Sequence, residues 1–195
     1  MLLGQGSAYG LRVAYFVVIA RLLGVVQYGV VVGAFALVNL VAQYSRLGTG
    51  TVLIRYVAPD HHRCGAYWGN SLLVTLVLGG GVILLLSVVA PHVIDPASAA
   101  IVAFMAIGSC LCEQIAISAT QVFSALQIMR TAAWLAQLTS LLRTMTAIGL
   151  LVVLRHATPR QWAIAYMLAS ALAAAVCVGV VTVRVGWPRF IPHLA

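Results

Sequence analysis

The stretch "SLLVTLVLGGGVILLLSVVA" (71–90) decides the fold, because its twenty residues include no charged side chain. An α-helix rises ~1.5 Å per residue and the hydrocarbon core of a bilayer is ~30 Å thick, so about 20 apolar residues make one membrane span. The run is too long for a barrel strand and does not alternate with a period of two. We therefore predict a membrane-spanning helix over residues 66–90.

The rest of the 195-residue chain has the same character. Hydrophobic residues make up 63% of it and charged residues 7%, and the mean hydropathy is +1.08; soluble domains carry about 25% charged residues. Besides 66–90, the predicted spans are 5–23, 28–45, 97–125, 131–154 and 161–184. The first is the weakest candidate, because it carries Arg12 and Arg21. These segments predict an all-α, polytopic membrane protein with a six-transmembrane-helix bundle over 1–186 and an interfacial stretch over 187–195.

Eleven arginines and three acids give the chain a net charge of +8. Basic residues gather in the loops that stay in the cytoplasm. If the N-terminus is cytoplasmic, six arginines fall on that side and three on the other: Arg46, Arg55, Arg63, Arg130, Arg184 and Arg189 against Arg21, Arg155 and Arg160. This distribution favours cytoplasmic N- and C-termini. It also explains the charge without a nucleic-acid partner.

The sequence contains no motif that would carry catalysis or hold a cofactor. There is no phosphate-binding glycine loop, no nucleophile elbow and no acid pair, since Asp60, Asp95 and Glu113 are far apart. The four cysteines lack metal-ligand spacing and are interpreted as small buried hydrophobes: Cys64, Cys110, Cys112 and Cys177. His61 and His62 are interpreted as part of a solvated loop. We expect a non-enzyme without metal or cofactor; a membrane enzyme acting on polyprenyl-phosphate sugars is a less favoured alternative.

Glycine and proline mark the connections between the predicted helices. In 21–29, Gly24 and Gly29 should break two helices and make a tight hairpin. Residues 51–57 suit a short interfacial segment, and the three glycines at 79–81 suit a close helix approach or a bend. Thr158 is a predicted N-cap, followed by Pro159 in the first turn of the last helix.

Arg143 and Glu113 are charges inside predicted spans. A charge at bilayer depth costs at least ~2.5–3.5 kcal/mol, so such residues usually have a role. If the chain turns near 126–131, both lie about 18–20 Å from the same membrane face, at 1.5 Å per residue. Each heads a polar stripe along its helix: Ser109, Glu113, Thr120 and Ser124 on one, and Thr139, Ser140, Arg143 and Thr146 on the other. We therefore predict that the two side chains approach within salt-bridge distance or across one water.

Two interpretations of this pair remain open at this point. In the first, it is a structural ion pair that ties two helices together. In the second, both stripes line a cavity in which Arg143 binds a pyrophosphate while Glu113 holds the guanidinium in place. The candidate cavity residues are Arg12, Arg143, Glu113, Thr139 and Thr120.

The stretch "ARLLGVVQYGVVVGAFALVNLVAQYSRLGTGTVLIRYVA" (20–58) resembles the start of polysaccharide flippases of the multidrug/oligosaccharidyl-lipid/polysaccharide superfamily. Those proteins commonly have Ala-Arg-x-Leu-Gly-Pro-x-x-Tyr-Gly in the first hairpin, then an Asp-x-Gly-x-Gly-like turn and an apolar stretch that ends in Arg. The matching residues here are Arg21, Leu23, Gly24, Tyr28, Gly29, Gly48, Gly50 and Arg55. Two positions depart from the pattern: Val25 replaces the proline, and Arg46 stands where an acid is common.

The resemblance implies a transporter of the bacterial inner membrane with two six-helix lobes around a cavity that alternates its opening. Its substrate would be an undecaprenyl-pyrophosphate-linked oligosaccharide, and this chain would be the first lobe, acting with a second lobe or as a homodimer. A cation-coupled multidrug exporter of the same superfamily and an inactive truncated remnant are the alternatives. Since alternating access uses two repeats that rock against each other, we expect residues 1–195 alone to insert without translocating substrate.

The predicted topology can be tested by cysteine labelling. A cysteine placed at His61 should react with a membrane-impermeant maleimide only after the cells are permeabilised, because loop 46–65 is predicted to be cytoplasmic. Labelling in intact cells, from the periplasmic side, would show that the protein has the opposite orientation in the membrane.

Overall fold

The computed structural model describes residues 2–46, 48–60, 64–93, 95–154 and 158–187. The elements in chain order are α1 (Leu2–Ala42), the 3-10 helix η1 (Gln43–Arg46), α2 (Thr49–Val57), α3 (Cys64–Val93), α4 (Pro96–Ala106), the π-helix η3 (Ile107–Cys112), α5 (Glu113–Ala125), α6 (Met129–Leu154) and α7 (Pro159–Val185). Among these residues there is no β-strand. The prediction of an all-α, polytopic membrane protein is confirmed.

Five helical segments are long and apolar enough to cross a membrane: Gln27–Val57, Cys64–His92, Ser98–Ala125, Met129–Val153 and Pro159–Val185. Each overlaps one of the second to sixth predicted spans, and Gln27–Val57 continues past residue 45, where the second predicted span ends. The first predicted span is helical as well, but its apolar part is the shorter helix Tyr15–Gly24. A crossing of the membrane by residues 5–23 therefore stays a prediction.

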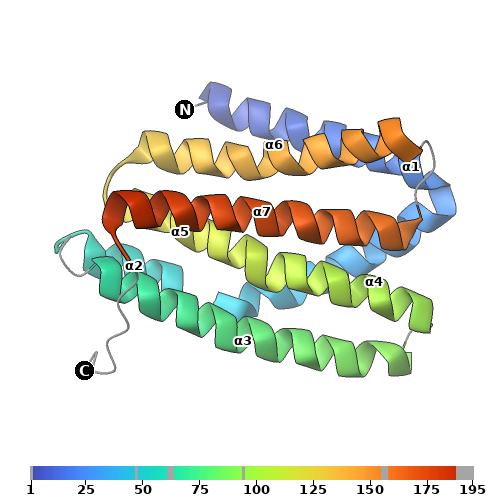
Figure 1. Cartoon of the computed structure of the whole chain (residues 1–195), viewed down its shortest axis with the longest axis horizontal. Helices are drawn as coiled ribbons and strands as arrows, with labels where there is room; N and C mark the ends of the chain where they lie inside the picture. The colour runs from blue at the N-terminus through green and yellow to red at the C-terminus, as the bar shows by residue number, and fades with distance from the viewer. Residues whose placement is uncertain (1, 47, 61–63, 94, 155–157, 188–195) are drawn as a thin grey trace.

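The chain reverses direction within α1 at a single glycine. Gly24 has φ 74° and ψ 166°, a conformation that residues with a side chain rarely adopt. In Figure 1 the dark blue first half of α1 runs beside α6, and the paler second half turns back from the far end. Gly29 lies inside the second helical half. The prediction that both glycines break helices is wrong for Gly29. The positive φ of Gly24 alone is enough to reverse the chain.

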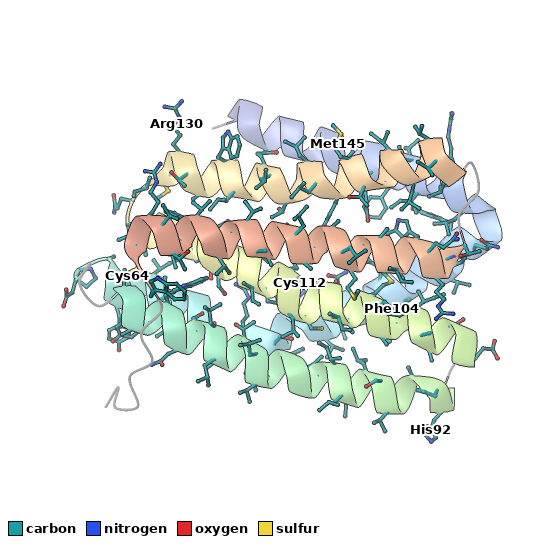
Figure 2. All side chains as sticks on the ribbon, viewed as in Figure 1. Cys64, His92, Phe104, Cys112, Arg130 and Met145 are labelled. Carbon is teal, nitrogen blue, oxygen red and sulfur yellow. The ribbon has the colours of Figure 1, made fainter. Side chains whose placement is uncertain are left out.

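The connections gather at the two ends of the bundle as the topology requires. Figure 1 shows the start of α1, helix α2, the α5–α6 turn and the end of α7 at one end. The reversal within α1, the end of α3, the start of α4, the end of α6 and the start of α7 lie at the other, where Figure 2 labels His92. This places Arg130 and Arg184 at the first end and Arg160 at the second. Which end faces the cytoplasm stays a prediction.

The helix boundaries follow local chemistry. Thr158 caps α7 with a reciprocal capping box, as its Oγ1 accepts from the Gln161 N–H at 3.4 Å and the Gln161 Oε1 accepts from the Thr158 N–H at 3.0 Å. The predicted N-cap is confirmed. Helix α3 runs beyond its predicted end at residue 90, through Pro91 to Val93; the proline lies in the last turn, where it removes one backbone hydrogen bond.

The fourth predicted span is interrupted by the π-helix η3. There the Glu113 N–H bonds to the Gly108 carbonyl five residues earlier. The amide Nε2 of Gln114 donates to the Ser109 carbonyl within this wide turn, at 3.2 Å. The sequence predicted a uniform helix here, and the π-helix is a correction to it.

Two apolar clusters form the core of the bundle. One joins residues of α1, α3, α4 and α7, with Cys110 among them; the other joins α2, α3, α5 and α7, with Cys64 and Cys177 among them. These three cysteines are buried free thiols, as the sequence predicted, and Cys112 is half-buried. Small and apolar residues thus fill the space between the helices.

Helix α3 packs most closely against η3 at Gly79. A Cβ there would lie 2.7 Å from the Cys110 carbonyl oxygen and 2.8 Å from Cδ2 of Leu111. At Gly80 and Gly81 a Cβ would meet nothing within 4 Å. The predicted close helix approach is therefore confirmed at one of the three glycines.

Substitution of these glycines should separate packing from helix propensity. We expect Gly79→Ala to lower the free energy of unfolding by about 1–3 kcal/mol, because the added methyl overlaps backbone that cannot move away. The matched control is Gly81→Ala, which lies on the same helix with its Cβ in open space and should leave stability unchanged or raise it. Thermal unfolding in detergent measures both; equal melting temperatures would contradict the close approach.

Candidate functional site

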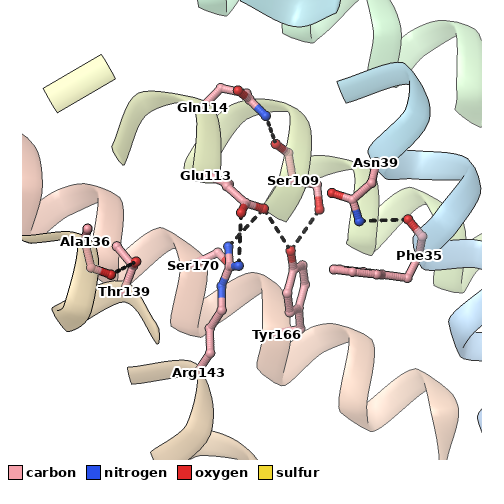
Figure 3. A network of polar contacts seen from close by, with 10 residues as sticks. All are labelled: Phe35, Asn39, Ser109, Glu113, Gln114, Ala136, Thr139, Arg143, Tyr166 and Ser170. Atoms are coloured by element: carbon pink, nitrogen blue, oxygen red, sulfur yellow. Dashed lines mark hydrogen bonds and ion pairs between the residues drawn. The ribbon is translucent and has the colours of Figure 1, made fainter. Parts of the chain in front are cut away.

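Arg143 of α6 and Glu113 of α5 form a bidentate ion pair. The Nη2 of Arg143 lies 3.1 Å from the Oε2 of Glu113, and its Nη1 donates to Oε1 at 3.2 Å (Figure 3). The predicted proximity is confirmed. The two side chains are 18% and 26% exposed, so the pair borders open space.

Helix α7 adds two residues to this pair. Arg143 Nη2 donates to the hydroxyl oxygen of Ser170 at 3.3 Å, and the hydroxyl of Tyr166 donates to Glu113 Oε2 at 3.3 Å. The guanidinium carbon lies 4.9 Å from the centre of the Tyr166 ring, within cation–π range. Three helices, α5, α6 and α7, are thus tied together by one polar network.

The π-helix contributes Ser109 to the network. Its hydroxyl lies 2.8 Å from the Tyr166 hydroxyl (Figure 3). Ser109 precedes Glu113 by one turn, so both face Tyr166. A π-turn in a membrane helix is often found at a functional site, and here it immediately precedes the charged residue.

A cavity of about 400 Å³ lies beside the ion pair. Its volume falls in the ~300–1,000 Å³ range of pockets that hold drug-sized ligands. Polar side chains on one part of its wall face aromatic rings on another. The polar lining consists of Glu113, Thr120, Thr139, Ser140, Arg143, Thr144 and Ser170, and the aromatic lining of Tyr15, Phe16 and Phe35.

Most of the predicted cavity residues lie at this cavity. Glu113, Arg143, Thr120 and Thr139 all line it. The side chain of Arg12 lies outside the described residues. A ligand role for any of these residues stays a prediction.

The two predicted polar stripes are only partly correct. Thr146 lines a separate, much smaller space beside Tyr15 and Trp162. Ser124 donates to the Thr120 carbonyl at 3.0 Å, and Ser109 bonds to Tyr166. Thr144, which the stripe did not include, lines the cavity instead.

The residues of 20–58 that match the family pattern lie outside the cavity. None of them is among its lining residues. Gly48, with φ 77°, begins α2, and Gly50 packs so closely on Gln121 that a Cβ would overlap its amide. Leu23 is buried and Tyr28 half-buried. The remaining members are Arg21 and Arg55, both exposed, Gly24 at the reversal, and Gly29 within α1.

Arg46 stands at the position where the pattern described above commonly has an acid. Its Nη1 donates to Oε1 of Gln121 at 3.1 Å, which joins η1 to α5. The substitution of an acid by Arg46 is therefore accommodated by a neutral acceptor in the neighbouring helix.

The residues that α7 and α1 contribute to the site were not predicted from the sequence. On α7, Trp162, Tyr166 and Ser170 follow one another at intervals of four residues and form one helix face. This spacing was the available signal. No comparable signal marked Tyr15 or Phe35, because an aromatic residue in an apolar span is normally a lipid-facing or core residue.

Comparison with known proteins agrees with this architecture. A family model described as polysaccharide biosynthesis protein matches residues 1–193. No curated protein and no solved structure matches the chain. The match spans the kinked first helix, all five long apolar helices and the charged cavity, so this multi-pass membrane protein belongs to the polysaccharide biosynthesis protein family.

Proposed function

We propose that the protein is a flippase, or one lobe of a flippase, that moves a lipid-linked oligosaccharide across the bacterial inner membrane for polysaccharide assembly. The observation that carries this proposal is Arg143, a guanidinium on the wall of a 400 Å³ cavity within a membrane-spanning helix. Its ligand would be the pyrophosphate of an undecaprenyl-pyrophosphate-linked glycan. The family match supports the pathway, and the cavity supports the kind of substrate.

The chemistry of the cavity suits an anionic sugar carrier. A guanidinium binds phosphate through paired, charge-assisted hydrogen bonds, which are stronger than neutral ones. The hydroxyls of Thr120, Thr139 and Ser140 on the same wall can donate to phosphate or sugar oxygens. Tyr15 and Phe35 offer apolar ring surface opposite them. Binding and release of such a headgroup need no covalent step, so we propose a transporter and not an enzyme.

Transport would require a second six-helix unit. Alternating access in transporters typically arises when two repeats rock about a site near the middle of the membrane. The partner is either a second lobe or a second copy of this chain, and both termini would face the cytoplasm.

A cation-coupled drug exporter is the less favoured alternative. Such a protein needs an acid in the membrane that exchanges protons or sodium ions. Glu113 is the acid that lines the cavity, and both of its carboxylate oxygens are engaged by Arg143. A carboxylate held in this way is not free to exchange a cation while the ion pair is formed.

The proposal predicts different results for stability and export. Arg143→Ala leaves Glu113 without its cation, and loss of one partner of a buried pair costs ~3–5 kcal/mol; we expect a smaller loss here, because the pair is partly exposed. The double variant Glu113→Gln/Arg143→Gln should restore folding, since it leaves no unpaired charge.

Polymer export is then measured in the organism that carries the gene, with each variant replacing the wild-type gene at its chromosomal position. We expect the double variant to fold but to reduce polymer export at least tenfold, because the phosphate-binding cation is gone. If the double variant restores both folding and export, Arg143 is only a structural residue and the proposal fails.

A further inference from the structure

Glu113 holds Arg143 in the way that a phosphate would hold it. We infer that the headgroup and Glu113 compete for the same edge of Arg143, so that substrate binding and the α5–α6 ion pair exclude each other. This inference rests on the proposed function. It assigns Glu113 the role of an internal competitor, where the sequence had suggested that Glu113 holds Arg143 ready for the substrate.

The geometry of the pair carries the first step. The Nη1 and Nη2 atoms of Arg143 each contact a different oxygen of Glu113, at 3.2 and 3.1 Å. This end-on, two-point contact is the arrangement in which arginine also binds phosphate. The carboxylate therefore occupies the donors that a phosphate needs.

The other edge of the guanidinium is closed as well. A guanidinium has two edges with paired donors, one formed by Nη1 and Nη2 and one by Nε and Nη2. The Nε of Arg143 is buried and has no partner, and its Nη2 also donates to Ser170. The ring of Tyr166 lies over the guanidinium. An anion consequently cannot make a two-point contact with Arg143 unless it replaces Glu113.

The exchange costs Glu113 its cation, but both charged groups keep a polar partner. Arg143 would gain a phosphate in place of a carboxylate. Glu113 would keep the hydroxyl of Tyr166, which already donates to its Oε2. Both residues border the cavity, so an incoming headgroup can reach them.

The exchange would also alter the bundle. The ion pair joins α5 to α6, whereas the Tyr166 contacts join α5 to α7. Displacement of Glu113 therefore removes this ion pair between α5 and α6 and leaves the α5–α7 contact in place. Binding of the substrate would thus be linked to a change in how α5 and α6 are held together.

The test measures binding of farnesyl diphosphate to the chain in lipid nanodiscs, with farnesol as the probe that lacks the diphosphate. Glu113→Gln removes the competing charge and should tighten binding about three- to tenfold, roughly the net effect of one ordinary hydrogen bond. The matched control is Asp95→Asn, which removes one negative charge at an exposed helix start and should leave the affinity unchanged. The double variant Glu113→Gln/Arg143→Gln should bind at least tenfold more weakly than the wild type.

The outcomes separate this inference from the proposed function. Tighter binding by Glu113→Gln together with loss in the double variant supports the competition. If the double variant loses binding but Glu113→Gln binds equally or more weakly, the anion site stands, yet Glu113 positions Arg143 and the inference is wrong. If wild type and double variant bind the probe equally well, the diphosphate does not bind at Arg143 and both proposals fail.

Discussion

The requirement that backbone polar groups find partners without water governs this structure. In hydrocarbon, each unpaired N–H or C=O costs several kcal/mol, so spanning segments are helical and departures from the helix must be compensated locally. The hydroxyls of Thr75 and Thr144 donate to backbone carbonyls one turn earlier, at 2.8 and 2.9 Å. Where η3 departs from α-helical bonding, the Gln114 amide serves the Ser109 carbonyl. Ser109 within this π-helix and Glu113 directly after it both bond to Tyr166.

The spans and the central ion pair could be predicted from the sequence because each rests on a simple constraint. Span length follows from the thickness of the hydrocarbon layer. Arg143 and Glu113 were placed at equal depth by the helical rise and one turn between them, and two opposite charges at equal depth in adjacent helices lower each other's cost. The capping box at Thr158 was likewise a local pattern. None of these predictions required knowledge of which non-sequential helices are neighbours.

The rest of the site depends on that knowledge. Tyr166 and Ser170 contact Arg143 because α7 packs against both α5 and α6, and periodicity within one helix carries no information on such packing. Phe35 reaches the cavity because the chain reverses at Gly24, upstream of it. The cavity is lined by residues of α1, α5, α6 and α7, so it depends on the packing of helices that are far apart in the sequence.

The π-helix also determines where the chain can change in length. A π-turn holds about one residue more than an α-turn, so loss of one residue between Ile107 and Cys112 would let the segment close into regular α-helix. Because the extra residue is taken up within the wide turn, the helices on either side would keep their relative orientation after that deletion, and Glu113 would still face Arg143. Loss of one residue from the regular helix of α5 would instead rotate everything after it by about 100° relative to what precedes it. The π-helix is therefore the place in this span at which the chain can change its length by one residue with the least disturbance.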